Sequence, residues 1–160
     1  MLLGTLITIA FTALNSRRRI RIQRRDAYSA AVRGILVDLL ISSDDFLRFA
    51  RVISDPANYD MLGMSRTTTL ADETEQTMRA FRRDLARCRI SVAEAPLRTQ
   101  CESLSLAFDE LAAVVHESVD AFWGSRPPGW SMASRTSAIE KLNLAISETE
   151  EVARNLLSPL

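Results

Sequence analysis

The sequence has few residues of several types, and each scarcity excludes a class of protein. Among 160 residues there are only five glycines and five prolines, which excludes a loop-rich or low-complexity chain. There is no glycine-rich phosphate loop and no CxxC motif around the two cysteines. Apolar residues make up 47% of the chain, enough for one domain with a hydrophobic core.

Histidine is also scarce, because His116 is the single histidine of the chain. His116 and Asp120 lie one helical turn apart, a partial match to the HExxH zinc motif that lacks the second histidine and a third ligand. The carboxylates fall at surface positions of the predicted helices, and the serines have no histidine or lysine partner at a telling spacing. We therefore expect no catalytic residue, no cofactor and no metal site. An enzyme or metal protein built around His116 is the alternative.

The charge of the chain is unevenly distributed, although its formal net charge is zero. Residues 1–33 contain seven arginines and one aspartate, a net charge of +6, and the remainder carries −6. Such an asymmetry predicts that the N-terminal part meets a negatively charged surface, either lipid headgroups or a nucleic acid. Nineteen of the twenty basic residues are arginine, which is typical of a GC-rich genome.

The first residues, MLLGTLITIAFTALNS, are uncharged, and an arginine-rich stretch follows them. As a helix, the apolar run reaches only ~20 Å, against ~30 Å of hydrocarbon, and the next arginines can snorkel towards the headgroups. Positive charge after the apolar run predicts a single-pass anchor in the cell membrane with a cytoplasmic C-terminal domain. We predict an anchor over residues 1–16 and a basic juxtamembrane segment over 17–26. Its lipid-contacting residues are Arg17, Arg18, Arg19, Arg21, Arg24 and Arg25. A secretory signal peptide and a soluble helical extension are the alternatives.

The arginine-rich stretch RRRIRIQRR also fits a nucleic acid, since clustered arginines neutralise phosphates. It has no interleaved aromatic residues, no zinc-ligand pattern and no recognisable recognition helix behind it. A soluble bundle that binds nucleic acid or a regulator through this segment is therefore kept as the alternative function.

After the arginines, apolar residues recur at alternating steps of three and four, and no strand pattern competes. This spacing predicts an all-α protein, an up-down antiparallel four-helix bundle with coiled-coil-like seams over residues 27–160. Its first helix extends N-terminally into the anchor. The predicted helices cover approximately 27–54, 67–94, 96–123 and 132–157. Ser137 and Glu140 match a capping box in the last of them.

The step between Val92 and Leu97 breaks the heptad, and Pro96 lies in the gap. If the chain folds back there, residues whose numbers sum to 189 face each other. The predicted apolar pairs include Cys88 with Cys101 and Phe81 with Phe108, and the predicted flanking ion pairs are Arg87 with Glu102 and Arg79 with Glu110. One continuous helix kinked at Pro96 is the alternative. Facing cysteines would form a disulfide in an oxidising compartment and stay reduced in the cytoplasm. We expect them to be reduced, because the arginines after the apolar run predict a cytoplasmic domain.

Two loops bring aromatic, methionine and arginine side chains to the predicted distal end of the bundle. Such residues are favoured in interaction hot spots, and the alternative is that they cap the open end of the core. The candidate partner-binding residues are Tyr59, Met61, Leu62, Met64, Arg126 and Trp130.

The short apolar start, the stretch ending RRDAYSAAVRGIL and the charged helical remainder resemble small membrane-anchored helical proteins of GC-rich bacteria and their phages. The resemblance implies neither an activity nor functional residues. Together, the patterns predict a membrane-tethered cytoplasmic helical bundle that acts as an interaction or scaffold protein. We expect anionic headgroups as its lipid contacts, and a protein partner or a second copy of the chain.

Overall fold

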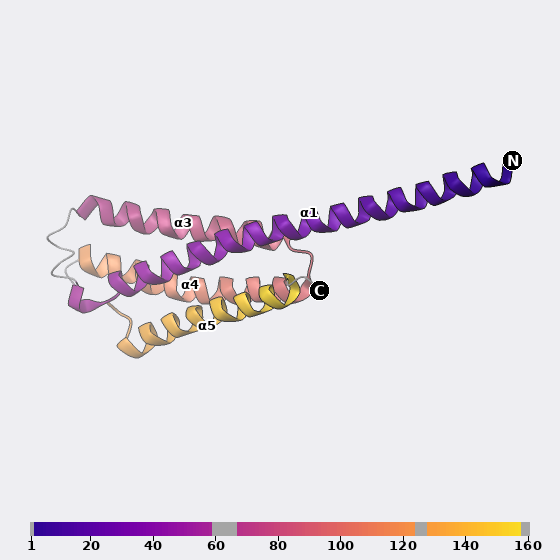
Figure 1. The fold of residues 1–160 in the computed structure, drawn as a ribbon. Helices are drawn as coiled ribbons and strands as arrows, with labels where there is room; N and C mark the ends of the chain where they lie inside the picture. Colours follow the sequence, from indigo (N-terminus) through magenta and orange to yellow (C-terminus); the bar gives the residue numbers. More distant parts are fainter. Residues whose placement is uncertain (1, 59–66, 124–127, 158–160) are drawn as a thin grey trace. The chain divides into compact units, whose positions relative to one another are not determined.

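The computed structural model (Figure 1) describes residues 2–58, 67–123 and 128–157. The regular secondary structure of these residues is helical, with four α-helices and no strand, which confirms the all-α part of the prediction. The elements are α1 (Leu2–Ile53), the 3₁₀ turn η1 (Pro56–Asn58), α3 (Thr67–Ser91), α4 (Ala95–Trp123) and α5 (Met132–Leu157). The apolar start, the arginine-rich stretch and the first predicted seam thus belong to the single helix α1.

The chain divides into two compact units, residues 1–34 and 35–160. The first unit is formed by the N-terminal part of α1 and carries the arginine-rich stretch. The second contains the rest of α1 together with α3, α4 and α5. Among the helices that the structure describes, none combines the length and the apolar character needed to cross a membrane.

The core of the second unit consists of the residues that recur at steps of three and four. Leu39, Leu85, Leu111 and Leu142, one from each helix, are buried, as this spacing predicts. Three phenylalanines join α1, α3 and α4, because the Phe108 ring lies 4.9 Å from that of Phe46 and 4.6 Å from that of Phe81, centroid to centroid. The Phe81–Phe108 pair is edge-to-face, a favoured aromatic geometry.

The predicted break between Val92 and Leu97 is confirmed, and the continuous helix kinked at Pro96 is wrong. Helix α3 ends at Ser91 and α4 begins at Ala95, so Pro96 lies in the first turn of α4, where a missing backbone N–H costs little. The contacts of Cys88 with Cys101 and of Phe81 with Phe108 match the predicted helical hairpin.

Both flanking ion pairs predicted for this hairpin are wrong. Arg79 pairs with Glu75 on its own helix, at 2.7 Å, and Glu110 pairs with Lys141 of α5, at 2.6 Å. Arg87 contacts Asp38 and Asp84. Exposed arginines are long and gain little from any one partner, so nearer carboxylates outside the hairpin interface replace the expected ones.

Helix α5 has the predicted bounds, but its N-terminal cap differs from the sequence prediction. Its first turn is capped by Ser131, whose Oγ accepts the backbone N–H of Ser134 at 3.1 Å, while the Ser134 Oγ accepts the N–H of Ser131 at 3.0 Å. Ser137 and Glu140 lie inside the helix and are exposed, so the predicted capping box is wrong. The reciprocal serine pair satisfies two backbone donors that the helix start leaves without partners.

One arginine connects the end of α1 to the start of α5. The Arg135 Nε donates to Ser54 Oγ at 2.8 Å, and its Nη2 donates to the backbone carbonyl of Arg51 at 3.0 Å. The Arg135 side chain is only 12% exposed, and its guanidinium also lies 4.0 Å from Asp55. It therefore supplies donors to carbonyl and hydroxyl groups at a helix C-terminus, where positive charge is favourable.

Candidate functional site

The predicted lipid-contacting arginines lie in the N-terminal unit. Arg17 and Arg18 belong to α1, and the side chains of Arg19, Arg21, Arg24 and Arg25 are exposed. Because Arg21, Arg24 and Arg25 are separated by three and four residues, they lie on the same side of the helix. Within the described part of the chain, no ion pair involves any of the four exposed arginines. Their charge is therefore available to an anionic partner.

Most of the predicted partner-binding residues, namely Tyr59, Met61, Leu62, Met64 and Arg126, lie outside the described residues. Trp130 is described and half-buried. Its indole Nε1–H donates to Ser118 Oγ of α4 at 2.9 Å, and the neighbouring Gly129 N–H donates to Glu117 Oε1 at 2.9 Å. Trp130 thus holds the segment that precedes α5 against α4, a role that the sequence pattern did not indicate.

His116 and Asp120, the partial zinc motif of the sequence, are exposed on α4. Among the described residues, no group of three or more histidine, cysteine, aspartate or glutamate side chains is arranged to hold a metal ion.

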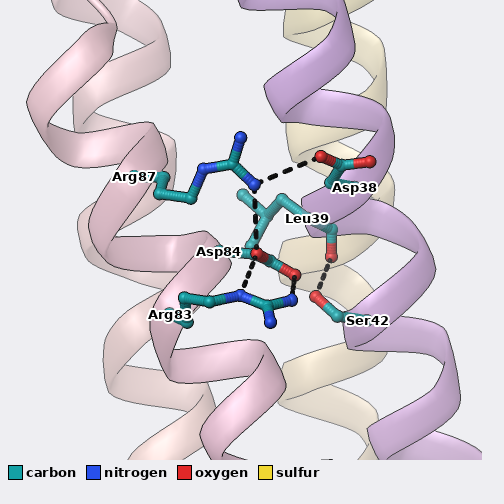
Figure 2. A network of polar contacts seen from close by, with 6 residues as sticks. All are labelled: Asp38, Leu39, Ser42, Arg83, Asp84 and Arg87. Carbon is teal, nitrogen blue, oxygen red and sulfur yellow. Dashed lines mark hydrogen bonds and ion pairs between the residues drawn. The ribbon is translucent and has the colours of Figure 1, made fainter.

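A cluster of polar side chains lies between α1 and α3 and is centred on Asp84 (Figure 2). Asp84 is only 3% exposed. Arg83 donates a hydrogen bond to each of its two carboxylate oxygens, from Nε to Oδ1 at 2.9 Å and from Nη2 to Oδ2 at 3.1 Å. Arg87 lies 3.6 Å from the same carboxylate and donates to Asp38 of α1 at 3.3 Å. Two arginines on α3 thus meet two carboxylates from two helices.

The electrostatics of this cluster favour the ionised form of Asp84. The hydrogen bonds from Arg83 are the main reason that the pKa of Asp84 is lowered, and burial opposes them. The positive charge of Arg83, a hydrogen bond from the Ser42 hydroxyl and the positive charge of Arg87 lower this pKa further. Because Arg83, Arg87 and Ser42 favour the ionised carboxylate, Asp84 is suited to fixing α3 against α1 rather than to accepting a proton in a reaction.

The sequence pattern did not identify this cluster. Helical spacing predicts which positions are buried from their apolar residues. Asp84 directly precedes the buried Leu85, and a charged residue at such a position is expected to lie at the exposed border of the apolar face. The Arg83-Asp84 dipeptide and Arg87 three residues later were available signals. The contribution of Asp38, 49 residues from Arg87, depends on how α1 packs.

The two cysteines form a second buried contact. Their Sγ atoms lie 2.8 Å apart across the α3–α4 hairpin, and both residues are free thiols with no exposed surface. The shared hydrogen bond and burial raise the pKa of Cys88, whereas the hydrogen bond from Cys88 lowers the pKa of Cys101.

A shallow groove runs along α4 and α5, between Leu106 and Leu144. Its apolar floor includes Ala107 and Ala145, and it is flanked by the Glu110–Lys141 ion pair. Leu106 and Leu144 are 69% and 59% exposed, high values for leucine in a folded domain.

Comparison with known proteins provides no further assignment: no family model, no curated protein and no solved structure matches this chain.

Proposed function

We propose that the protein is a membrane-tethered helical interaction protein. Residues 1–34 hold it against an anionic membrane, and the second unit works on the cytoplasmic side as a scaffold without catalytic activity. The observation that carries the proposal is the set of exposed arginines at positions 21, 24 and 25, which lie on one side of α1 without an ion pair in the described residues. Such a side fits a surface of anionic headgroups.

The uncharged residues 2–14 support the membrane assignment, because they precede the arginine-rich stretch on the same helix. A helix with an apolar segment followed by arginines can lie in the boundary between headgroups and acyl chains. Electrostatic attraction then adds about 1 kcal/mol for each arginine near the surface. Two such signals together give stable attachment, and of the two the apolar segment resists high salt, whereas the electrostatic attraction of the arginines does not.

We further propose that α1, α3, α4 and α5 form an up-down antiparallel bundle. Three contacts between helices support this arrangement: Asp38 with Arg87, Phe81 with Phe108, and Glu110 with Lys141. Each of these three helix pairs has residues side by side at a second place along its interface. There, a residue further along one helix lies beside a residue further back along the other, as antiparallel helices require. An antiparallel bundle would place the C-terminal ends of α1 and α4 and the N-terminal ends of α3 and α5 at one end, where a protein partner or a second copy of the chain would bind.

The test is binding of the full chain to vesicles of phosphatidylglycerol and phosphatidylcholine. Arg21, Arg24 and Arg25 are changed together to glutamine, which removes three charges and keeps helix propensity. At low salt, we expect the affinity for anionic vesicles to fall about a hundredfold, from ~1 kcal/mol for each arginine. The measurement is the fraction of chain that floats with the vesicles as a function of lipid concentration.

The matched control changes three exposed arginines of the second unit, Arg48, Arg89 and Arg154, to glutamine. It removes the same net charge and should leave vesicle binding within about twofold of the wild type. Equal loss in both variants, or equal binding of the wild type to neutral and anionic vesicles, would contradict the proposal. Salt-sensitive binding to DNA or RNA without binding to vesicles would instead assign the segment to a nucleic acid.

A further inference from the structure

The two buried cysteines lie close enough to react with each other. Cys88 is in the last turn of α3 and Cys101 is in the second turn of α4, and their Sγ atoms are 2.8 Å apart. This separation lies between the ~2.05 Å of a disulfide bond and the ~3.5–4.0 Å at which non-bonded heavy atoms normally pack. Both residues are free thiols with no exposed surface, so a bond between them would form inside the core.

We propose that Cys88 and Cys101 are a redox-reactive dithiol, which a hydroperoxide converts into a reversible disulfide that cross-links α3 to α4. This inference goes beyond the proposed membrane function and does not depend on it. The opposed sulfur atoms require only a small closing movement, because the two helices already pack with these side chains in one layer.

The two thiols have different roles in the reaction. The hydrogen bond from the Cys88 thiol lowers the pKa of Cys101, and the positive charge of Arg89 acts in the same direction. The same bond, together with burial, raises the pKa of Cys88. Cys101 is therefore the thiol that ionises first, and a thiolate is the nucleophilic form of cysteine.

The chemical steps balance without a further reactant. The Cys101 thiolate attacks one oxygen of the hydroperoxide, the O–O bond breaks, and the other oxygen leaves as hydroxide or alkoxide, which takes up a proton. Cys101 is then a sulfenic acid. The Cys88 sulfur attacks the Cys101 sulfur, and the hydroxyl group leaves as water with the Cys88 proton. Two thiols are oxidised and one peroxide is reduced.

The position of the pair explains how an oxidant reaches it. The short connection Val92–Glu94 joins the two helices, and both cysteines lie within two turns of it. Helix ends open locally far more often than the whole domain unfolds. Oxidation therefore depends on opening of this end of the hairpin, and it should be slower than oxidation of an exposed dithiol.

The test uses the full chain in native buffer with hydrogen peroxide. We expect both thiols to be lost, the intact mass to fall by two hydrogen atoms, and the product to migrate as a single chain without reductant. The cross-link should raise the midpoint of thermal unfolding by about 10 °C, because closing a loop of this length restricts the unfolded chain. Dithiothreitol should restore the thiols and the original midpoint.

The variants Cys88→Ser and Cys101→Ser serve as controls, and neither should show the rise in unfolding midpoint. In Cys88→Ser the remaining Cys101 should accumulate as sulfenic acid, which a dimedone adduct detects, because the resolving thiol is absent. The proposal is overturned if the folded wild type gains oxygen atoms instead of losing hydrogen, if it forms disulfide-linked dimers, or if the bond forms only in denaturant.

Discussion

Among single side chains, Asp84 shows how a buried charge is accommodated at a helix interface. Its carboxylate is 3% exposed, yet the two arginines that bind it extend into solvent, with side chains 66% and 52% exposed. The arginines thus keep most of their hydration, and the cost of burial falls mainly on one carboxylate. The cluster fixes the orientation of α3 against α1, which hydrophobic packing alone would not determine.

Changing Asp84 to asparagine should lower the free energy of unfolding by about 1–3 kcal/mol at pH 7, because hydrogen bonds to a charged group are lost in a buried place. The check is urea unfolding of the variant and the wild type, followed by circular dichroism. Asp109→Asn, at an exposed position on α4, is the matched control and should stay within about 0.5 kcal/mol of the wild type.

The same pair of variants predicts a pH dependence. The pKa of Asp84 is lower in the folded chain than in the unfolded chain, so its ionisation stabilises the fold above the unfolded pKa of ~3.9. This stabilisation is lost as the pH falls through the lower folded pKa. The difference in unfolding free energy between wild type and Asp84→Asn should therefore shrink below about pH 4. A difference that is constant between pH 7 and pH 2.5 would show that Asp84 acts through packing instead of charge.

Among single helices, α5 shows where a local sequence rule fails. Both Ser131 with Ser134 and Ser137 with Glu140 have the spacing of a capping pair, and the second has the better residue types. The structure uses the first, because α5 already begins at Met132 and buries Ala138 and Leu142 in the core. Tertiary packing thus decides the helix start over the local motif.

Two alanine substitutions distinguish these serines. Ser131→Ala should destabilise the second unit by about 1 kcal/mol, the usual cost of losing an N-cap. Ser137→Ala should be neutral or slightly stabilising, since alanine is the better helix former inside an exposed helix. Thermal unfolding of the two variants measures the difference, and a larger loss from Ser137→Ala would contradict the assigned cap.

Much of the helical core could be predicted from the sequence, because apolar side chains at steps of three and four must share one face. The same rule gave the register of the hairpin at Cys88–Cys101 and Phe81–Phe108. The spacing rule did not predict the ion-pair partners of Arg79 and Arg87. Exposed ion pairs contribute little free energy each, so a long arginine side chain can pair with any of several nearby carboxylates. Trp130 was predicted as a binding residue, whereas its indole hydrogen bond to Ser118 depends on a tertiary contact.

Across the full chain, the two units differ in the sign of their charge and in what that charge can bind. In the first unit, the side chains of Arg19, Arg21, Arg24 and Arg25 are exposed and make no ion pair among the described residues. In the second unit, by contrast, Arg79, Arg83, Arg87 and Arg135 have carboxylate partners within the fold. The proposed division of labour follows from this contrast: the first unit attaches the protein to a surface, and the second folds and binds.

Cell fractionation tests this division most directly. The intact chain is expressed, membranes are pelleted, and the pellet is washed with high salt, which removes purely electrostatic attachment. The account predicts that the intact chain stays in the washed pellet, and that a variant with Ile7→Ser and Phe11→Ser together with glutamine at positions 21, 24 and 25 moves to the supernatant. An intact chain found wholly in the supernatant before the salt wash would contradict it.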